Sequence, residues 1–134
     1  LLALGASAEL YKGGIVPLAQ FAEMPFDRDI LVRVHIPKEN AAFFYQSVRP
    51  TRTDFPSLTC AAARLESGEY RFAIGARPGK AVVLAPQGTP EELPELVCAQ
   101  LVTGSNLRGS AEYRKHLARV LVRRAVETLE GGAK

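Results

Sequence analysis

Side chains able to do chemistry are few and widely separated in this chain of 134 residues. The two cysteines, Cys60 and Cys98, lie among small apolar residues, and neither belongs to the Cys-x-x-Cys pair of many metal and iron–sulfur sites. His35 and His116 have no partner at metal-ligand spacing. No Gly-x-Gly-x-x-Gly or other Gly-rich phosphate loop occurs. The sequence therefore predicts buried, inert thiols and indicates no catalytic residue and no metal ligand.

A basic stripe is the other feature that bears on binding. Residues 110–129 predict one amphipathic helix, capped by Ser110 and ended by Gly131 and Gly132. Its expected apolar face consists of Tyr113, Leu117, Val120, Leu121, Ala125 and Leu129. Its expected solvent face carries Arg114, Lys115, Arg119 and Arg123. The arginines are interpreted as solvated, and the alternative is a basic face that binds phosphate or an acidic partner.

The composition indicates a folded domain in a reducing compartment. Hydrophobic residues make up 47% and charged residues 23%, with a net charge of +3. This mild charge argues against a general nucleic-acid binder. No apolar run is long enough to span a membrane, no signal peptide is recognised, and unpaired cysteines suit the cytoplasm. Because the chain begins at Leu1 and its one methionine is Met24, we expect an excerpt of a longer polypeptide, or a processed or truncated product.

The elements that would position any site follow from periodicity. In residues 1–37 we expect strands over 2–11, 15–18 and 30–36, with a turn at 13–14 and a helical turn at 18–23. The stretch 30–36 alternates, which predicts a half-buried strand with Ile30, Val32, Val34 and Ile36 on one side.

Residues 38–134 predict a second unit. The expected elements are a helix over 41–47 capped by Asn40, strands over 57–65, 70–76 and 81–84, and a helix from Thr89 to about 102 that restarts at Pro94. Residues 66–69 form the expected hairpin turn. Arg49, Arg52 and Asp54 are expected to pin the loop before the first of these strands. The predicted fold class is α+β, with a small antiparallel sheet of three to four strands packed against helices.

The amino-acid sequences of several segments resemble those of a known protein family. Residues 109–117 and 120–125 are similar to the C-terminal signature of the flavoprotein (medium) subunit of molybdenum hydroxylases, a group that includes carbon monoxide dehydrogenase and bacterial xanthine dehydrogenase. Further segments resemble the same family in the same order, namely 4–10, 15–18, 29–37, 44–55 and 71–76. The resemblance implies the tail of an FAD-binding domain over 1–37 and a CO dehydrogenase flavoprotein C-terminal-like domain over 38–134.

The resemblance also implies a function in electron transfer. In this family the subunit binds FAD, takes electrons from an iron–sulfur small subunit that receives them from a molybdopterin-binding large subunit, and passes them to an acceptor. By position, Ile30 and Leu31 match apolar contacts to the isoalloxazine, and Gln46 stands where many members carry a lysine. The Gly-rich pyrophosphate loops of the family lie outside these residues. We therefore expect a scaffold, a wall at the flavin edge and a docking surface for subunits.

Two other functions stay open at this stage. The first is a free-standing, non-catalytic interaction module of the same fold. The second is a binder of nucleic acid or of an acidic ligand through the arginines of the last helix, for which the sequence gives the weakest support.

Overall fold

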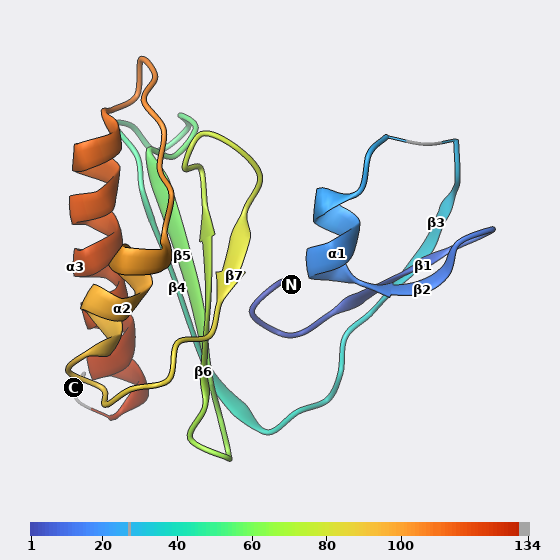
Figure 1. Cartoon of the computed structure of the whole chain (residues 1–134), viewed down its shortest axis with the longest axis horizontal. Helices are drawn as coiled ribbons and strands as arrows, with labels where there is room; N and C mark the ends of the chain where they lie inside the picture. Colours follow the sequence, from blue (N-terminus) through green and yellow to red (C-terminus); the bar gives the residue numbers. More distant parts are fainter. Residues whose placement is uncertain (27, 132–134) are drawn as a thin grey trace.

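Two antiparallel sheets organise the computed structural model of the chain, which describes residues 1–26 and 28–131 (Figure 1). A three-stranded sheet has the order β2-β1-β3, and a four-stranded sheet has the order β4-β5-β6-β7. The strands are β1 (Ser7–Leu10), β2 (Gly14–Pro17), β3 (Leu31–His35), β4 (Ala41–Val48), β5 (Leu58–Leu65), β6 (Tyr70–Gly75) and β7 (Val82–Leu84). The helices are α1 (Leu18–Glu23), α2 (Leu93–Gln100) and α3 (Ala111–Leu129).

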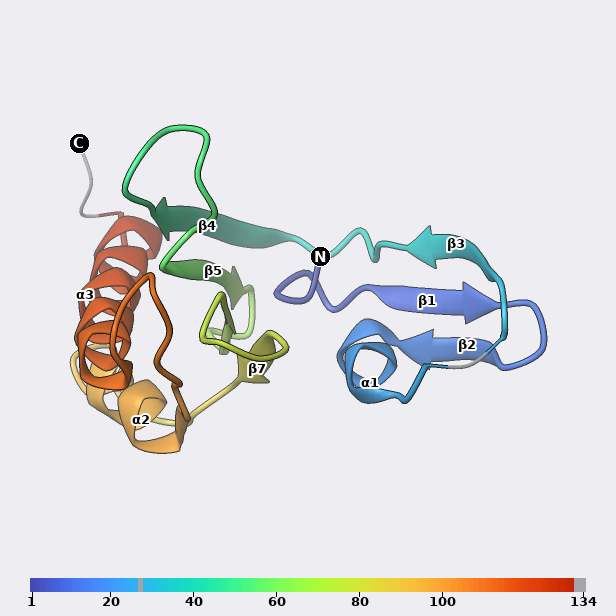
Figure 2. The same ribbon diagram turned by 90° about the horizontal axis from the view of Figure 1, so that it is seen from above.

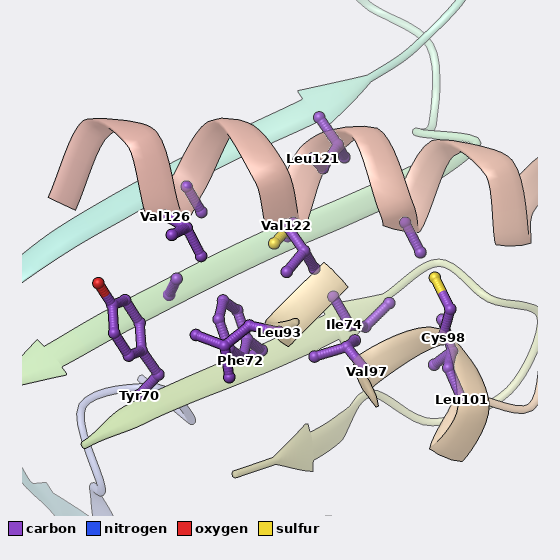
Figure 3. Packing of buried hydrophobic residues seen from close by; sticks show 14 of the residues in the cluster. Tyr70, Phe72, Ile74, Leu93, Val97, Cys98, Leu101, Leu121, Val122 and Val126 are labelled. Atoms are coloured by element: carbon purple, nitrogen blue, oxygen red, sulfur yellow. The ribbon is translucent and has the colours of Figure 1, made fainter. Parts of the chain in front are cut away.

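The main core lies between the four-stranded sheet and the helices α2 and α3, which cover one of its faces (Figure 1). Alternate residues of β5 and β6 point into this core, as the period of a strand requires. Phe72 is fully buried, and its ring stacks on Tyr70 with centroids 5.7 Å apart. Figure 3 shows these rings beneath Val122 and Val126 of α3 and beside Leu93 of α2. The predicted α+β class, with a small antiparallel sheet against helices, is confirmed.

Helix α3 begins as predicted, but its buried face differs from the expected one. The Ser110 hydroxyl accepts a hydrogen bond from the Tyr113 amide at 3.1 Å, which confirms the cap. Tyr113 is exposed, and the buried positions of the helix are Arg114, Ala118, Leu121, Val122, Ala125, Val126 and Leu129. The buried face thus includes Arg114, Ala118, Val122 and Val126, which were not expected in it, and leaves Tyr113 outside. Gly131 follows the helix with φ of 86°, and Gly132 lies outside the described residues.

The expected helix over 41–47 is wrong, because residues 41–48 form strand β4. All eight of its residues pair with β5, from Ala41 with Leu65 to Val48 with Leu58. Phe44 packs against the core, whereas Phe43 and Tyr45 on the opposite face are exposed. Bulky aromatic residues favour strands, and pairing with β5 outweighs a capping signal at Asn40.

The strand predicted over 30–36 forms as β3, but the prediction that it is half-buried is wrong. Every residue of β3 is exposed, because β3 is an edge strand and α1 contacts β1 and β2 instead. The alternation is interrupted as well, since a register shift between Glu9 and Leu10 pairs Leu10 with Leu31. The first predicted strand is shorter than expected, because residues before Ser7 form turns in which Gly5 adopts φ of 67°.

The remaining sequence predictions hold with shifted ends. The hairpin turn at 66–69 joins β5 to β6, and Gly68 adopts φ of 85° there. Helix α2 spans Leu93–Gln100 and has Pro94 in its first turn, so it is one short helix rather than an interrupted one. The Glu92 carboxylate accepts from the Thr89 amide at 2.9 Å, as the helix-start pattern predicts.

Burial should make the Cys60 thiol chemically inert. Cys60 has no exposed surface, and desolvation raises its pKa from 9.0 to about 12. Because the folded-state value is raised, its contribution to stability is complete below pH 9 and is lost as the pH rises towards 12. At pH 8.5, iodoacetamide should label Cys60 in the urea-unfolded chain and leave it unmodified in the folded chain, as read by peptide mass spectrometry. Equal labelling rates in both states would contradict the buried position.

Candidate functional site

A cavity lies on the face of the four-stranded sheet that the helices leave open. The N-terminal residues Leu2 and Ala3 pack on this face against Ala63 and Ala73. The cavity beside them has a volume of about 310 Å³ and is lined by Leu1, Leu2, Ala3, Tyr45, Thr59, Ala61, Ala73, Gly75 and Ala81. Figure 1 shows the N-terminus on this side of the sheet, between the two sheets.

Small side chains keep the floor of this cavity flat. Thr59 pairs with Gly75, and a Cβ at Gly75 would lie 2.6 Å from the Thr59 Oγ1 atom. The polar side-chain groups among the lining residues are the hydroxyls of Tyr45 and Thr59. Tyr45 is 65% exposed, so its ring stands free at the edge of the cavity. The site therefore suits a flat, mainly apolar group, with two hydroxyls as its polar side-chain groups.

Arg71 connects this face to the first part of the chain. Its Nη1 atom donates to the Glu39 carboxylate at 3.2 Å. A Cβ at Gly5 would lie 2.9 Å from the same nitrogen. Gly5 therefore lies close to the Arg71 side chain and has a left-handed backbone conformation. Any side chain at this position would disturb the N-terminal loop above the sheet.

Ile30 and Leu31 stand at the tip of the three-stranded sheet. Both are exposed, at 64% and 48%, in spite of their apolar side chains. Asp29 fixes this tip, because its carboxylate accepts from the backbone amides of Ile30 at 2.8 Å and Gly13 at 2.7 Å. It also accepts from the Lys12 amide at 3.0 Å. Desolvation raises the pKa of Asp29, but the hydrogen bonds from these amides outweigh it and hold the pKa below 3.8.

Gln46 lies on the other sheet, near the end of β4. It pairs with Cys60, and by the period of the strand it shares the helix-covered side with Phe44. The structure does not bring Gln46 next to Ile30 and Leu31. In Figure 2, β3 and β4 follow one another along one path, with Leu31 at the start of the first and Gln46 near the end of the second.

A polar cluster of Glu9, Arg33 and His35 lies on the three-stranded sheet. Glu9 accepts from His35 at 2.7 Å and pairs with Arg33 at 3.1 Å, so His35 is engaged on the surface of the sheet. Within residues 1–26 and 28–131, no group of three or more His, Cys, Asp or Glu side chains is placed to hold a metal ion. No helix in the same residues is long and apolar enough to cross a membrane.

The expected Arg49–Arg52–Asp54 cluster is wrong in its pairing. Asp54 pairs with Arg108 at 3.4 Å, and Arg49 donates to the Ser47 hydroxyl at 3.0 Å. Sequence reasoning considered only neighbours along the chain, whereas the loop between α2 and α3 packs beside this one. The same limitation hid Asp29, whose signal is an acidic residue directly before a strand and after a Gly-Gly turn.

Neutralising Asp29 should loosen the tip that presents Ile30 and Leu31. In the Asp29→Asn variant an amide replaces a carboxylate that accepts from backbone amides, so the charge-assisted bonds are lost. We expect the Lys12 and Gly13 amides to exchange their hydrogens about tenfold faster, measured by NMR. In the wild type, the folded pKa is lowered, so this protection is present above pH 3.8 and is lost as the pH falls further. Unchanged exchange would show that Asp29 does not hold the turn.

Known proteins share this sequence pattern. The family model described as the CO dehydrogenase flavoprotein C-terminal domain matches residues 42–129, which is more than half of the chain. The chain belongs to this family. The match begins in β4 and ends at the last residue of α3, so it covers the four-stranded sheet and both helices of the flavoprotein C-terminal domain. No curated protein matches the sequence.

Solved structures extend the likeness of fold beyond the flavoprotein C-terminal domain. Carbon monoxide dehydrogenase from Hydrogenophaga pseudoflava superposes with a TM-score of 0.80 at 20% identity, over 99% of this chain and 55% of that one. Reconstituted CO dehydrogenase from Oligotropha carboxidovorans gives 0.78 at 22% identity, over 98% and 55%. Quinoline 2-oxidoreductase from Pseudomonas putida 86 gives 0.76 at 22% identity, over 98% and 54%. The chain thus spans about half the length of the chains that it matches.

Proposed function

We propose that this chain is the C-terminal part of a flavoprotein subunit that relays electrons from iron–sulfur clusters through FAD to an acceptor in a molybdenum hydroxylase. Residues 1–37 would be the tail of its FAD-binding domain, and residues 38–134 the C-terminal domain. The observation that supports this most is the family match over residues 42–129. The proposed partners are the molybdopterin-binding large subunit, the iron–sulfur small subunit and the rest of the FAD subunit, and the proposed location is the cytoplasm.

The residues present fit part of FAD and not all of it. The cavity between Leu2 and Ala73 has a flat apolar floor, and its volume of about 310 Å³ suits one ring system rather than a dinucleotide. The chain has no Gly-rich loop to hold a pyrophosphate. FAD, when bound, supplies the redox chemistry, and the protein supplies position and electrostatics. We therefore assign this chain the role of a wall for the flavin ring.

The proposed flavin contacts divide into two groups. Ile30 and Leu31 are exposed apolar side chains at a tip fixed by Asp29, so they can cover an aromatic edge and exclude water. Gln46 is proposed as a separate contact from β4, where its amide offers hydrogen bonds and no charge. Tyr45 points to the opposite face of β4 from Gln46, so it can border a ring in the cavity on the open face but not a ring that contacts Gln46.

The proposal is tested in the full-length subunit by its FAD content. In Leu31→Asp, a carboxylate would face the ring, and we expect about tenfold less bound FAD than in the wild type, measured by visible absorbance. Ile15→Asp is the matched control. Ile15 is also an exposed apolar residue of the same sheet, but it lies on the opposite edge strand β2, where it pairs with Glu9, whereas Leu31 on β3 pairs with Leu10. Equal FAD content in both variants would remove Leu31 from the site. Gln46→Ala should shift the flavin absorbance without loss of FAD.

The 134 residues alone should bind FAD weakly or not at all, because no pyrophosphate site is present. A yellow protein with stoichiometric FAD would contradict this expectation. The alternative function is a free-standing, non-catalytic interaction module with the same fold. Genes for large and small hydroxylase subunits beside the coding sequence would favour the electron relay, and their absence would favour the module.

A further inference from the structure

Three loops meet at one end of the C-terminal domain. They are the β4–β5 loop (49–57), the β6–β7 loop (76–81) and the α2–α3 loop (101–110). The pairing of Val48 with Leu58 and of Ile74 with Val82 places the first two loops at the same end of the antiparallel sheet. Helix α3 begins at this end too. Figure 1 shows the three loops together at the top, and Figure 2 looks down on them.

This loop end concentrates positive charge. Its cationic side chains are Arg49, Arg52, Arg77, Lys80 and Arg108, with Arg114 directly below them. The carboxylates here are Asp54 and, in the first turn of α3, Glu112. The N-terminus of α3 adds a partial positive charge. Since the whole chain has a net charge of only +3, its positive excess lies at this end.

Exposed apolar side chains stand among these charges. Leu107 is fully exposed, and Phe55 is 74% exposed. The Arg108 guanidinium lies over the Phe55 ring, 5.2 Å from its centroid. Aromatic and arginine side chains of this kind dominate the binding energy of protein interfaces. A free phosphate would use the charges but would leave the apolar side chains in water.

The loops are held in place before any partner binds. The Ser57 hydroxyl donates to the Arg108 carbonyl at 3.0 Å. Arg77 donates from Nε to the Lys80 carbonyl and from Nη1 to the Val102 carbonyl, both at 2.8 Å. Because these bonds cross-link all three loops, little conformational entropy remains to be lost on binding.

We propose that this loop end docks onto an acidic surface of a partner subunit, with Leu107 and Phe55 entering an apolar depression bordered by carboxylates. The inference rests on the proposed function only in that the partner is a subunit of the same enzyme. The excess of positive charge at the loop end favours an acidic partner surface. The exposed apolar side chains of Leu107 and Phe55 favour a protein partner over a small anion. Contacts of this kind accelerate association and make it sensitive to salt.

The test measures association of the full-length flavoprotein subunit with the purified subassembly of large and small subunits, at low and at high salt. Arg52→Glu should weaken binding about tenfold at low salt and reduce its salt dependence, and Arg52→Lys should restore it. Leu107→Ser should weaken binding about tenfold at both salt concentrations. Both side chains are exposed, so melting temperatures should match the wild type. Arg124→Glu, the same charge reversal in the C-terminal half of α3, should bind within about twofold of the wild type.

The outcomes separate this inference from the proposed function. If the wild type associates and both variants bind as tightly, the loop end is not the docking surface and the proposed function is unaffected. Millimolar inorganic pyrophosphate is added as a competitor to the wild type and to Leu107→Ser. If it displaces both proteins equally, and if Leu107→Ser by itself binds the partner as tightly as the wild type, then a small anion is the occupant and the inference is overturned. If the wild type does not associate at all, the proposed function fails and this inference fails with it.

Discussion

Replacing Arg114 with alanine is expected to destabilise the folded chain by about 3–5 kcal/mol, which is the size of effect seen when a buried polar network loses its centre. Arg114 is 1% exposed. Its guanidinium donates to the carbonyl oxygens of Ser57, Ala76, Gly104 and Gly109 and to the Asn106 side-chain oxygen. Its removal leaves several buried acceptors unpaired, each of which costs about 1–3 kcal/mol. Urea unfolding followed by circular dichroism measures the change in free energy.

The matched control is Arg124→Ala on the same helix. Arg124 is exposed, so its replacement should change the free energy of unfolding by less than about 0.5 kcal/mol. Arg114→Lys keeps the charge but cannot reach five acceptors, and we expect an intermediate loss. A loss below about 1 kcal/mol for Arg114→Ala would mean that water or a rearranged loop satisfies these carbonyls.

Phe72→Ala should lower the free energy of unfolding by about 3–5 kcal/mol, because it leaves a cavity in the centre of the core. Phe72 is fully buried, between the sheet and helices α2 and α3 (Figure 3). The substitution also removes the stacked contact with Tyr70. Chemical unfolding gives the change, and the slope of the transition should stay the same.

Phe55→Ala is the control for the loss of an aromatic ring. Phe55 is 74% exposed and contacts Arg108, so its removal should cost less than about 1 kcal/mol. If the two variants were equally stable, the sheet would not be packed against α3 as described.

Local signals predicted helix α3 and the hairpin of β5 and β6. The Ser110 cap and the glycines that follow the helix act within one turn of the chain, and in the turn at 66–69 Gly68 supplies the positive φ. In β5, Leu58, Cys60 and Ala62 alternate towards the helix-covered core, although Ala63 on the other face is also buried, beside Leu2 and Ala3.

Contacts between distant segments account for the failures. A capping signal at Asn40 suggested a helix over 41–47, whereas the aromatic residues there favour a strand, and pairing with β5 decides for the strand. Arg114 was expected in water because arginine seldom lies in a core. Its acceptors come from the β4–β5, β6–β7 and α2–α3 loops, and no pattern within α3 indicates that these carbonyls converge.

The candidate site also combines residues that the sequence indicated with features that only the structure showed. Ile30, Leu31 and Gln46 were chosen by resemblance, which assigned Ile30 and Leu31 to the first unit and Gln46 to the second, but Gln46 was expected on a helix and lies on strand β4. The cavity at Tyr45 and Gly75 was not foreseen, because it forms only where the N-terminal residues lie over small side chains of another sheet. The sequence assigned no role of its own to Asp29, whose carboxylate fixes the tip that holds Ile30 and Leu31.

The sequence by itself determined the family, the α+β class, the cap of α3, the turns and the absence of a phosphate loop, because each of these depends on residue types within a few positions of one another. Only the tertiary structure decided that β4 is a strand, that Arg114 is buried, that β3 is exposed and that three charged loops meet at one end. These features depend on which distant backbone groups come to lie beside a residue, and that follows from the packing of the whole chain.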